Sequence, residues 1–156
     1  MSRRWNGWTG CVVALTVMAC GSDDPVVDQT DPAVAPFVGT WDAVEFTVTN
    51  DADTTDVADL LTNGSFTVNI QPSGLYTATL VLGTFNPFVE IGQLTVSGSV
   101  LTLTPSGGPG PCPASSVYAF SDANTLVLDG PTCLDVNLDG EDEDAQAHIV
   151  LERRPS

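Results

Sequence analysis

Hydrophobic and polar residues alternate along most of the chain after residue 37, with the period of two that is typical of half-buried strands. The alternation falls into eight segments, near 44–48, 66–70, 76–82, 94–96, 101–103, 117–120, 126–128 and 147–151. Short polar turns at 72–74, 97–99 and 122–124 join six of these segments into three consecutive hairpins. The pattern predicts an all-β domain of eight antiparallel strands that follow one another in chain order.

A sheet of sequential hairpins leaves exposed edges unless it closes on itself, which favours an up-and-down antiparallel barrel. A β-sandwich with the same strand count is the rival fold, and pairing of the first strand with the last would distinguish the two. One short helix is predicted at residues 56–61, because Thr54 or Thr55 provides a cap before it and Gly64 follows it.

The first 19 residues contain no acid, carry Arg3 and Arg4, and include the apolar run CVVALTVMA from Cys11 to Ala19. This run is far shorter than the roughly 20 residues that span a bilayer, so it is typical of an export signal rather than a membrane helix. The sequence VMAC at 17–20 resembles the lipobox of bacterial lipoproteins. The resemblance implies a signal peptide of residues 1–19 and a lipid anchor, with acyl chains such as palmitate, on Cys20. An ordinary secretory signal with a chance cysteine is the alternative.

Residues 20–36 are acidic, contain prolines and show no periodicity, so we interpret them as an extended tether before a domain of residues 37–154. Gly21 does not resemble the aspartate that retains some lipoproteins in the inner membrane. The lipoprotein resemblance therefore implies a lipid-anchored protein of the bacterial cell envelope, at the outer membrane.

The charge balance excludes two classes of function. The chain has 20 acidic residues against 4 basic ones and no lysine, for a formal net charge of -16. Such a surface repels phosphate backbones and anionic headgroups, so neither nucleic-acid binding nor polybasic membrane binding is expected. Removal of the signal peptide leaves Arg153 and Arg154 as the only arginines.

Two cysteines remain after the signal peptide and the lipidated Cys20 are set aside, namely Cys112 and Cys133. In an oxidising compartment they are expected to form a disulfide, which contributes roughly 3 kcal/mol by closing a loop of this length. A zinc site is not expected, because the chain has no CxxC motif and a single, distant histidine.

The densest cluster of acids lies between the last two predicted strands. Asp135, Asn137, Asp139 and Gly140 give D-x-N-x-D-G, the first half of an EF-hand calcium loop. Glu141 would add its backbone carbonyl, and Glu143 or Asp144 a further carboxylate. The match ends at the twelfth position, where Gln146 replaces the bidentate glutamate. The predicted cofactor is calcium, and the alternative is a solvated acidic turn.

The triplet Gly39, Thr40, Trp41 at the start of the first strand matches the Gly-x-Trp that opens lipocalins. With its eight predicted strands and a last strand ending in arginine, the domain resembles the small lipocalin-like domains of bacterial lipoproteins. The resemblance implies that Trp41 plugs the closed end of the barrel and that Arg153 stacks on it. The alternative is a plain core tryptophan with solvated arginines.

Lipocalins carry small apolar molecules in the barrel, so the resemblance implies a non-enzymatic binding module for a small apolar ligand. An eight-stranded barrel is only just wide enough for its own side chains or one small ligand. The alternative is therefore a structural or interaction lipoprotein of the envelope, with a filled barrel and a calcium-binding loop. No catalytic motif is present, and His148, on an alternating strand, is expected to have a packing or surface role.

Overall fold

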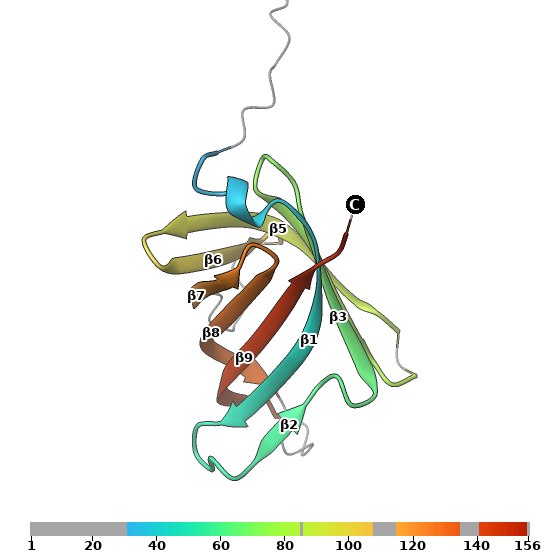
Figure 1. Cartoon of the computed structure of the whole chain (residues 1–156). Coiled ribbons are helices and arrows are strands. Elements are labelled where there is room, and N and C mark those ends of the chain that lie inside the picture. Colours follow the sequence, from blue (N-terminus) through green and yellow to red (C-terminus); the bar gives the residue numbers. More distant parts are fainter. Residues whose placement is uncertain (1–30, 85, 108–114, 135–140, 156) are drawn as a thin grey trace, which may run out of the picture.

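Nine antiparallel strands and one 3-10 turn make up the described part of a computed structural model, which covers residues 31–84, 86–107, 115–134 and 141–155 (Figure 1). The elements are η1 (Ala35–Phe37), β1 (Gly39–Asn50), β2 (Val57–Asp59), β3 (Gly64–Ile70), β4 (Leu75–Leu82), β5 (Phe88–Ser97), β6 (Val100–Pro105), β7 (Ser115–Asp122), β8 (Thr125–Leu134) and β9 (Glu143–Arg153).

The first long strand pairs with the last, which closes the sheet. The strand order is β2-β1-β3-β4-β5-β6-β7-β8-β9, and β1 also pairs antiparallel with β9, with Trp41 opposite Arg153. This pairing confirms the predicted eight-stranded up-and-down barrel, formed by β1 and β3 to β9, and excludes the β-sandwich. The ninth strand, β2, pairs with Thr47–Thr49 of β1, on the edge that β3 pairs with at Gly39–Asp42.

The prediction of a short helix at residues 56–61 is wrong. Val57–Asp59 form β2 and pair with Thr47–Thr49 of β1. The Asp59 carboxylate then accepts hydrogen bonds from the Leu61 amide (2.9 Å) and the Thr62 hydroxyl (3.0 Å), which turns the chain before a helix can start. In the described residues the single helical element is η1, which has a proline in its first turn.

The two ends of the barrel differ. Tight turns join β3 to β4, β5 to β6 and β7 to β8 at one end, where η1 also lies; we call this the closed end (Figure 1). At the β7–β8 turn the Asp122 carboxylate accepts hydrogen bonds from the Asn124 amide and the Thr125 hydroxyl. The opposite end, which we call the open end, holds the segment from β1 to β3 and the starts of β5, β7 and β9.

The main hydrophobic core fills the closed end. Trp41, Phe37 and Tyr76 are its largest fully buried side chains. The Phe37 ring lies edge-on to Tyr118, with centroids 4.9 Å apart, so η1 packs across the barrel end. Val34 also belongs to this core, although it lies in the stretch expected to be tether. No helix among the described residues has the length and apolarity needed to cross a membrane.

Candidate functional site

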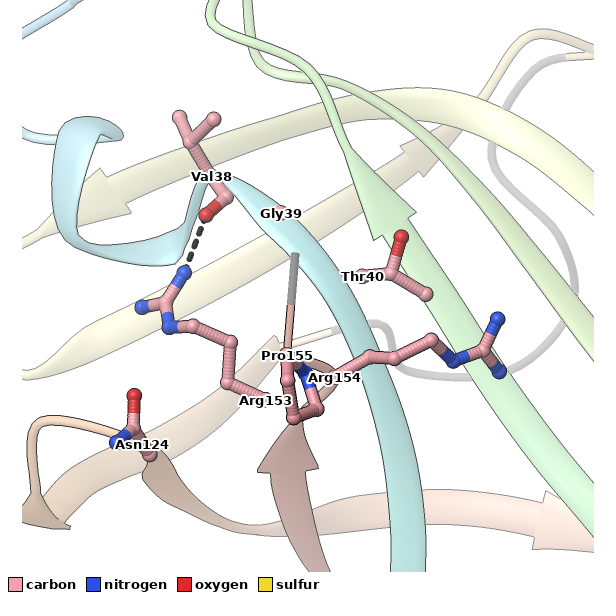
Figure 2. Close-up of a pocket in the computed structure, with 7 residues that line it drawn as sticks. All are labelled: Val38, Gly39, Thr40, Asn124, Arg153, Arg154 and Pro155. Carbon is pink, nitrogen blue, oxygen red and sulfur yellow. Dashed lines mark hydrogen bonds between the residues drawn. The ribbon is translucent and has the colours of Figure 1, made fainter.

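Arg153 stacks on Trp41 at the closed end, so the structure brings the predicted pair together. The guanidinium carbon lies 4.0 Å from the centroid of the indole. The guanidinium also donates a hydrogen bond to the carbonyl oxygen of Val38 (Figure 2). It donates a second one to the carbonyl oxygen of Pro36 at 2.7 Å. Trp41 Nε1 donates to the Phe37 carbonyl at 2.7 Å. One arginine thereby ties η1, β1 and β9 together, as an end plug requires.

Steric constraints explain why the first residue of the Gly-x-Trp triplet is a glycine. Gly39 has φ of +133°, which is unfavourable for residues with a side chain, and a Cβ there would lie 3.0 Å from Arg153 Nη1. Any side chain at this position would press on the guanidinium where it crosses the strand. Gly39 therefore makes the stacked geometry of Arg153 possible.

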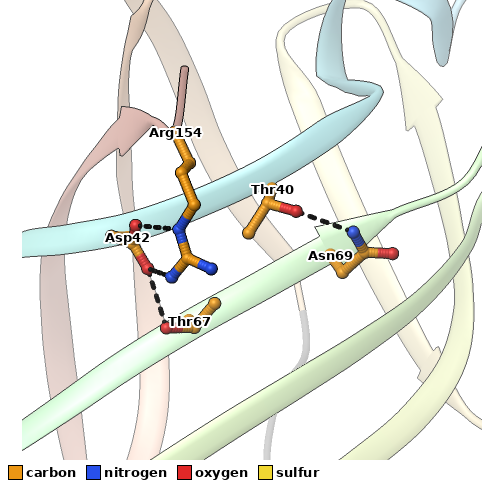
Figure 3. Close-up of polar contacts among 5 residues, drawn as sticks. All are labelled: Thr40, Asp42, Thr67, Asn69 and Arg154. Atoms are coloured by element: carbon orange, nitrogen blue, oxygen red, sulfur yellow. Dashed lines mark hydrogen bonds and ion pairs between the residues drawn. The ribbon is translucent and has the colours of Figure 1, made fainter. Parts of the chain in front are cut away.

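Arg154 points the other way and pairs with Asp42 on the outside of the barrel. Its Nε and Nη2 lie 2.8 and 2.5 Å from the two carboxylate oxygens, and the Thr67 hydroxyl donates to Oδ1 at 2.9 Å (Figure 3). The hydrogen bond from Arg154 is the main cause that lowers the pKa of Asp42 below its usual value. Both arginines are thus engaged at the closed end.

A surface hollow of about 610 Å³ lies between these two arginines. It is lined by Val38, Gly39, Thr40, Asn124, Arg153, Arg154 and Pro155 (Figure 2). The donors of Arg153 face backbone carbonyls, and Arg154 is held by Asp42. The hollow is therefore the outer face of the plug, and we do not assign it a ligand.

The inside of the barrel changes character toward the open end. At the closed end several inward side chains are fully buried, among them Leu94, Leu126 and Leu151. Further along the strands, inward side chains that are only partly buried include Phe46, Phe66, Leu80, Leu103, Ser116 and Ala147. Val48 and Ala145 are fully buried in a second, smaller cluster, against which Phe46 and Ala147 pack. Phe88, which pairs with Leu80, is 65% exposed. Solvent therefore reaches part of the inner face in the open half.

A tyrosine and a glutamate meet on the inner face where the core gives way to this solvated half. Tyr76 is 1% exposed, and its hydroxyl donates a hydrogen bond to Glu90 Oε1 at 2.6 Å. Burial, with a smaller contribution from Glu90, raises the pKa of Tyr76 well above its usual value, so the phenol stays a donor. Gly92 makes room for the ring, since a Cβ there would lie 2.8 Å from Tyr76 Cε1.

Acidic side chains gather on one side of the open end, beside β1 and β9. They belong to two segments, Asp51, Asp53, Asp56 and Asp59 after β1, and Glu141, Asp142, Glu143 and Asp144 at the start of β9. The Asp51 amide donates to the Asp144 carbonyl at 3.0 Å, so the two segments lie side by side. In the part of the chain that the structure describes, the arginines lie at the closed end. The rim therefore carries a concentrated negative potential.

Several predicted site residues lie outside the described residues, namely Cys20, Cys112, Asp135, Asn137 and Asp139. Cys133 lies in β8, and Glu141 and Glu143 lie at the rim. Within the described ranges, no group of three or more histidine, cysteine or acidic side chains is arranged to hold a metal ion. The lipid anchor, the disulfide and the calcium site thus stay predictions.

His148 lies on the outer face of β9. Its Nδ1 is 2.6 Å from Asp129 Oδ1, and its Nε2 is 3.9 Å from Glu45 Oε1. The imidazole is half-exposed between these two carboxylates, remote from the inner face of the barrel. The geometry agrees with the surface role expected from its strand position.

Comparison with known proteins supports the fold class. No protein-family model and no curated protein match the chain. The solved structure of EF1p2_mFAP2b bound to DFHBI is 19% identical and covers 78% of this chain and 97% of its own, with a TM-score of 0.50. The crystal structure of Rv2717c from M. tuberculosis is 15% identical and covers 80% of this chain and 99% of its own, with a TM-score of 0.40. The protein is therefore a closed eight-stranded antiparallel barrel, which is consistent with a lipocalin-like fold.

Proposed function

We propose that this protein is a non-enzymatic binding module that holds a small, mostly apolar molecule in the open half of its barrel. The observation that carries the proposal is the solvent exposure of inward side chains in this half, from the partly buried Phe66 and Leu80 to Phe88, which is 65% exposed. Phe46 and Phe66 line this half with ring centroids 5.3 Å apart. A ligand that covers these rings and the rim residue Phe88 would remove apolar surface from water.

The fold comparison agrees with this use. EF1p2_mFAP2b, which shares the fold, is bound to the small molecule DFHBI. A barrel filled by its own side chains, acting as a structural or interaction module with a calcium-binding acidic loop, is the competing proposal. The two differ in whether space inside the open half takes up a probe.

We expect the purified protein to bind the neutral fluorescent probe N-phenyl-1-naphthylamine, and Ala147→Phe to weaken that binding by roughly tenfold or more. Ala147 lies at an inward, partly buried position of β9, so a phenyl ring there would occupy the space of the ligand. The measurement is a fluorescence titration, with far-UV circular dichroism to verify folding.

Gln146→Phe is the matched control, because Gln146 is the exposed neighbour of Ala147 on the same strand. It adds the same ring outside the barrel and is expected to leave probe affinity unchanged. Equal effects of the two substitutions, or no probe uptake by the wild-type protein, would favour the filled barrel.

We further propose that the protein is exported and anchored through a lipid on Cys20, in the bacterial cell envelope at the outer membrane. The support is the apolar run and the VMAC sequence at 17–20. In cells fed labelled palmitate, the wild-type chain should incorporate label and sediment with membranes, whereas Cys20→Ser should do neither. Label retained by Cys20→Ser would contradict the anchor, and Cys11→Ser is the control that should behave as wild type.

A further inference from the structure

Glu90 places a carboxylate on the inner face of the barrel at the base of the solvated half. It lies opposite Ala78 in the β4–β5 pairing, on the same face as the buried Tyr76 and Leu94. Its flanking residues Val89 and Ile91 point outward and are more than half exposed. The carboxylate therefore faces the interior that the proposed ligand would enter.

The hydrogen bond from Tyr76 uses only part of what this carboxylate can accept. Two carboxylate oxygens offer about four acceptor positions, and the phenol fills one of them. A carboxylate in a largely apolar surrounding costs free energy unless a cation or further donors face it. In the described ranges Tyr76 is the one hydrogen-bond partner of Glu90, so the remaining acceptor positions are open to a ligand.

The basic side chains of the described chain lie elsewhere. Arg153 lies on Trp41, Arg154 pairs with Asp42, and His148 lies on the outer face beside Asp129. The chain contains no lysine. Within the part that the structure describes, no basic side chain of the protein therefore lies beside Glu90.

The acidic rim would also favour a positively charged ligand. The acids of the two rim segments, such as Asp51 and Asp144, line one side of the way into the open half. Clefts lined by one sign of charge concentrate oppositely charged solutes and speed their association. An anionic ligand would meet repulsion first at the rim and again at Glu90.

From these observations we infer that the ligand is a hydrophobic amine, whose ammonium group binds Glu90 while its apolar body lies among Phe46, Phe66 and Leu80. The inference rests on the proposed binding function and specifies the chemistry of the ligand. An ammonium donates up to three hydrogen bonds and carries the charge that the inner carboxylate lacks. The exposed ring of Phe88 at the rim offers a further cation–π contact during entry.

The test compares three competitors that share one tail and differ in head group: octylamine, 1-octanol and octanoate. Each is titrated against N-phenyl-1-naphthylamine bound to the wild-type protein at pH 7, and the loss of probe fluorescence is measured. We expect octylamine to compete about tenfold or more better than 1-octanol, and octanoate to be the weakest. The preference for octylamine should shrink as salt is raised, while competition by 1-octanol should not.

Glu90→Gln should abolish the preference for octylamine and leave 1-octanol unchanged. Glu152→Gln, which removes an exposed carboxylate on the outer side of β9, should keep the preference. A second measurement needs no variant: the amide signals of Ala78 and Glu90 in the wild-type protein should shift more with octylamine than with 1-octanol.

The outcomes separate the two proposals. Absence of probe binding would overturn the binding function itself. Probe binding with equal competition by octylamine and 1-octanol, equal shifts of the two amide signals, or a preference that survives in folded Glu90→Gln would overturn the amine inference and leave the binding function standing.

Discussion

Replacement of Trp41 by alanine is expected to lower the free energy of unfolding by about 3–5 kcal/mol, the range seen when a large aromatic is removed from a core. Trp41 is fully buried, and it links three parts of the closed end. Its indole N–H donates a hydrogen bond to the Phe37 carbonyl, and Arg153 stacks on its ring. The ring also packs against Phe120, with centroids 6.2 Å apart. Urea denaturation would measure the loss.

Two further variants divide this loss into its parts. Trp41→Phe retains much of the buried ring but removes the N–H donor, so it should cost clearly less than the alanine variant. Arg153→Ala removes the stacking, for which roughly 0.5–2 kcal/mol is expected, together with the hydrogen bonds to the Val38 and Pro36 carbonyls. A loss below about 1 kcal/mol for Trp41→Ala would contradict the role of an end plug.

Gly92→Ala is expected to lower the free energy of unfolding by about 3 kcal/mol or more, the upper part of the range for overpacking. A Cβ at this position would lie 2.2 Å from the Thr104 carbonyl oxygen of the paired strand and 2.8 Å from the Tyr76 ring. Since the backbone oxygen cannot turn aside, β5 must move away from β6 or from β4. Thermal unfolding followed by circular dichroism would measure the effect.

Gly107→Ala provides the matched control, because a Cβ at Gly107 meets nothing within 4 Å. It should stay within about 0.5 kcal/mol of the wild type. The Gly92 variant should also weaken binding of octylamine, since a displaced Tyr76 no longer orients Glu90. Melting of Gly92→Ala at the wild-type temperature would show that the sheet absorbs the added methyl group.

The barrel could be predicted from the sequence because each hairpin is encoded locally. A polar turn between two alternating strands sets the pairing of those strands, and three such hairpins in succession leave closure as the simplest way to protect the edges. The Trp41 and Arg153 pair could be predicted for a related reason. Alternation places Arg153 on the same face as Ile149 and Leu151, which fixes the direction of its side chain.

The features that could not be predicted from the sequence, β2 and the inward Glu90, depend on partners distant in the sequence. Residues 57–59 form a strand because the exposed edge of β1 offers backbone partners, which outweigh a weak local helix signal. Glu90 lies in the same alternating pattern as Gly92, Leu94 and Val96, but a charged residue and a glycine hide that pattern. The carboxylate is tolerated inside because Tyr76 of the neighbouring strand supplies a hydrogen bond.

The position of η1 also determines how the barrel would face a membrane. The chain enters the domain at the closed end, where Val34 and Phe37 are buried in the core beneath the plug. Anchoring through the residues that precede them would attach the barrel by its closed end, so the acidic mouth would lie at the end farther from the point of attachment. An anchored barrel in this orientation would sample solutes of the aqueous compartment, and amphiphiles dissolved in the anchoring leaflet would have to leave it before they could enter.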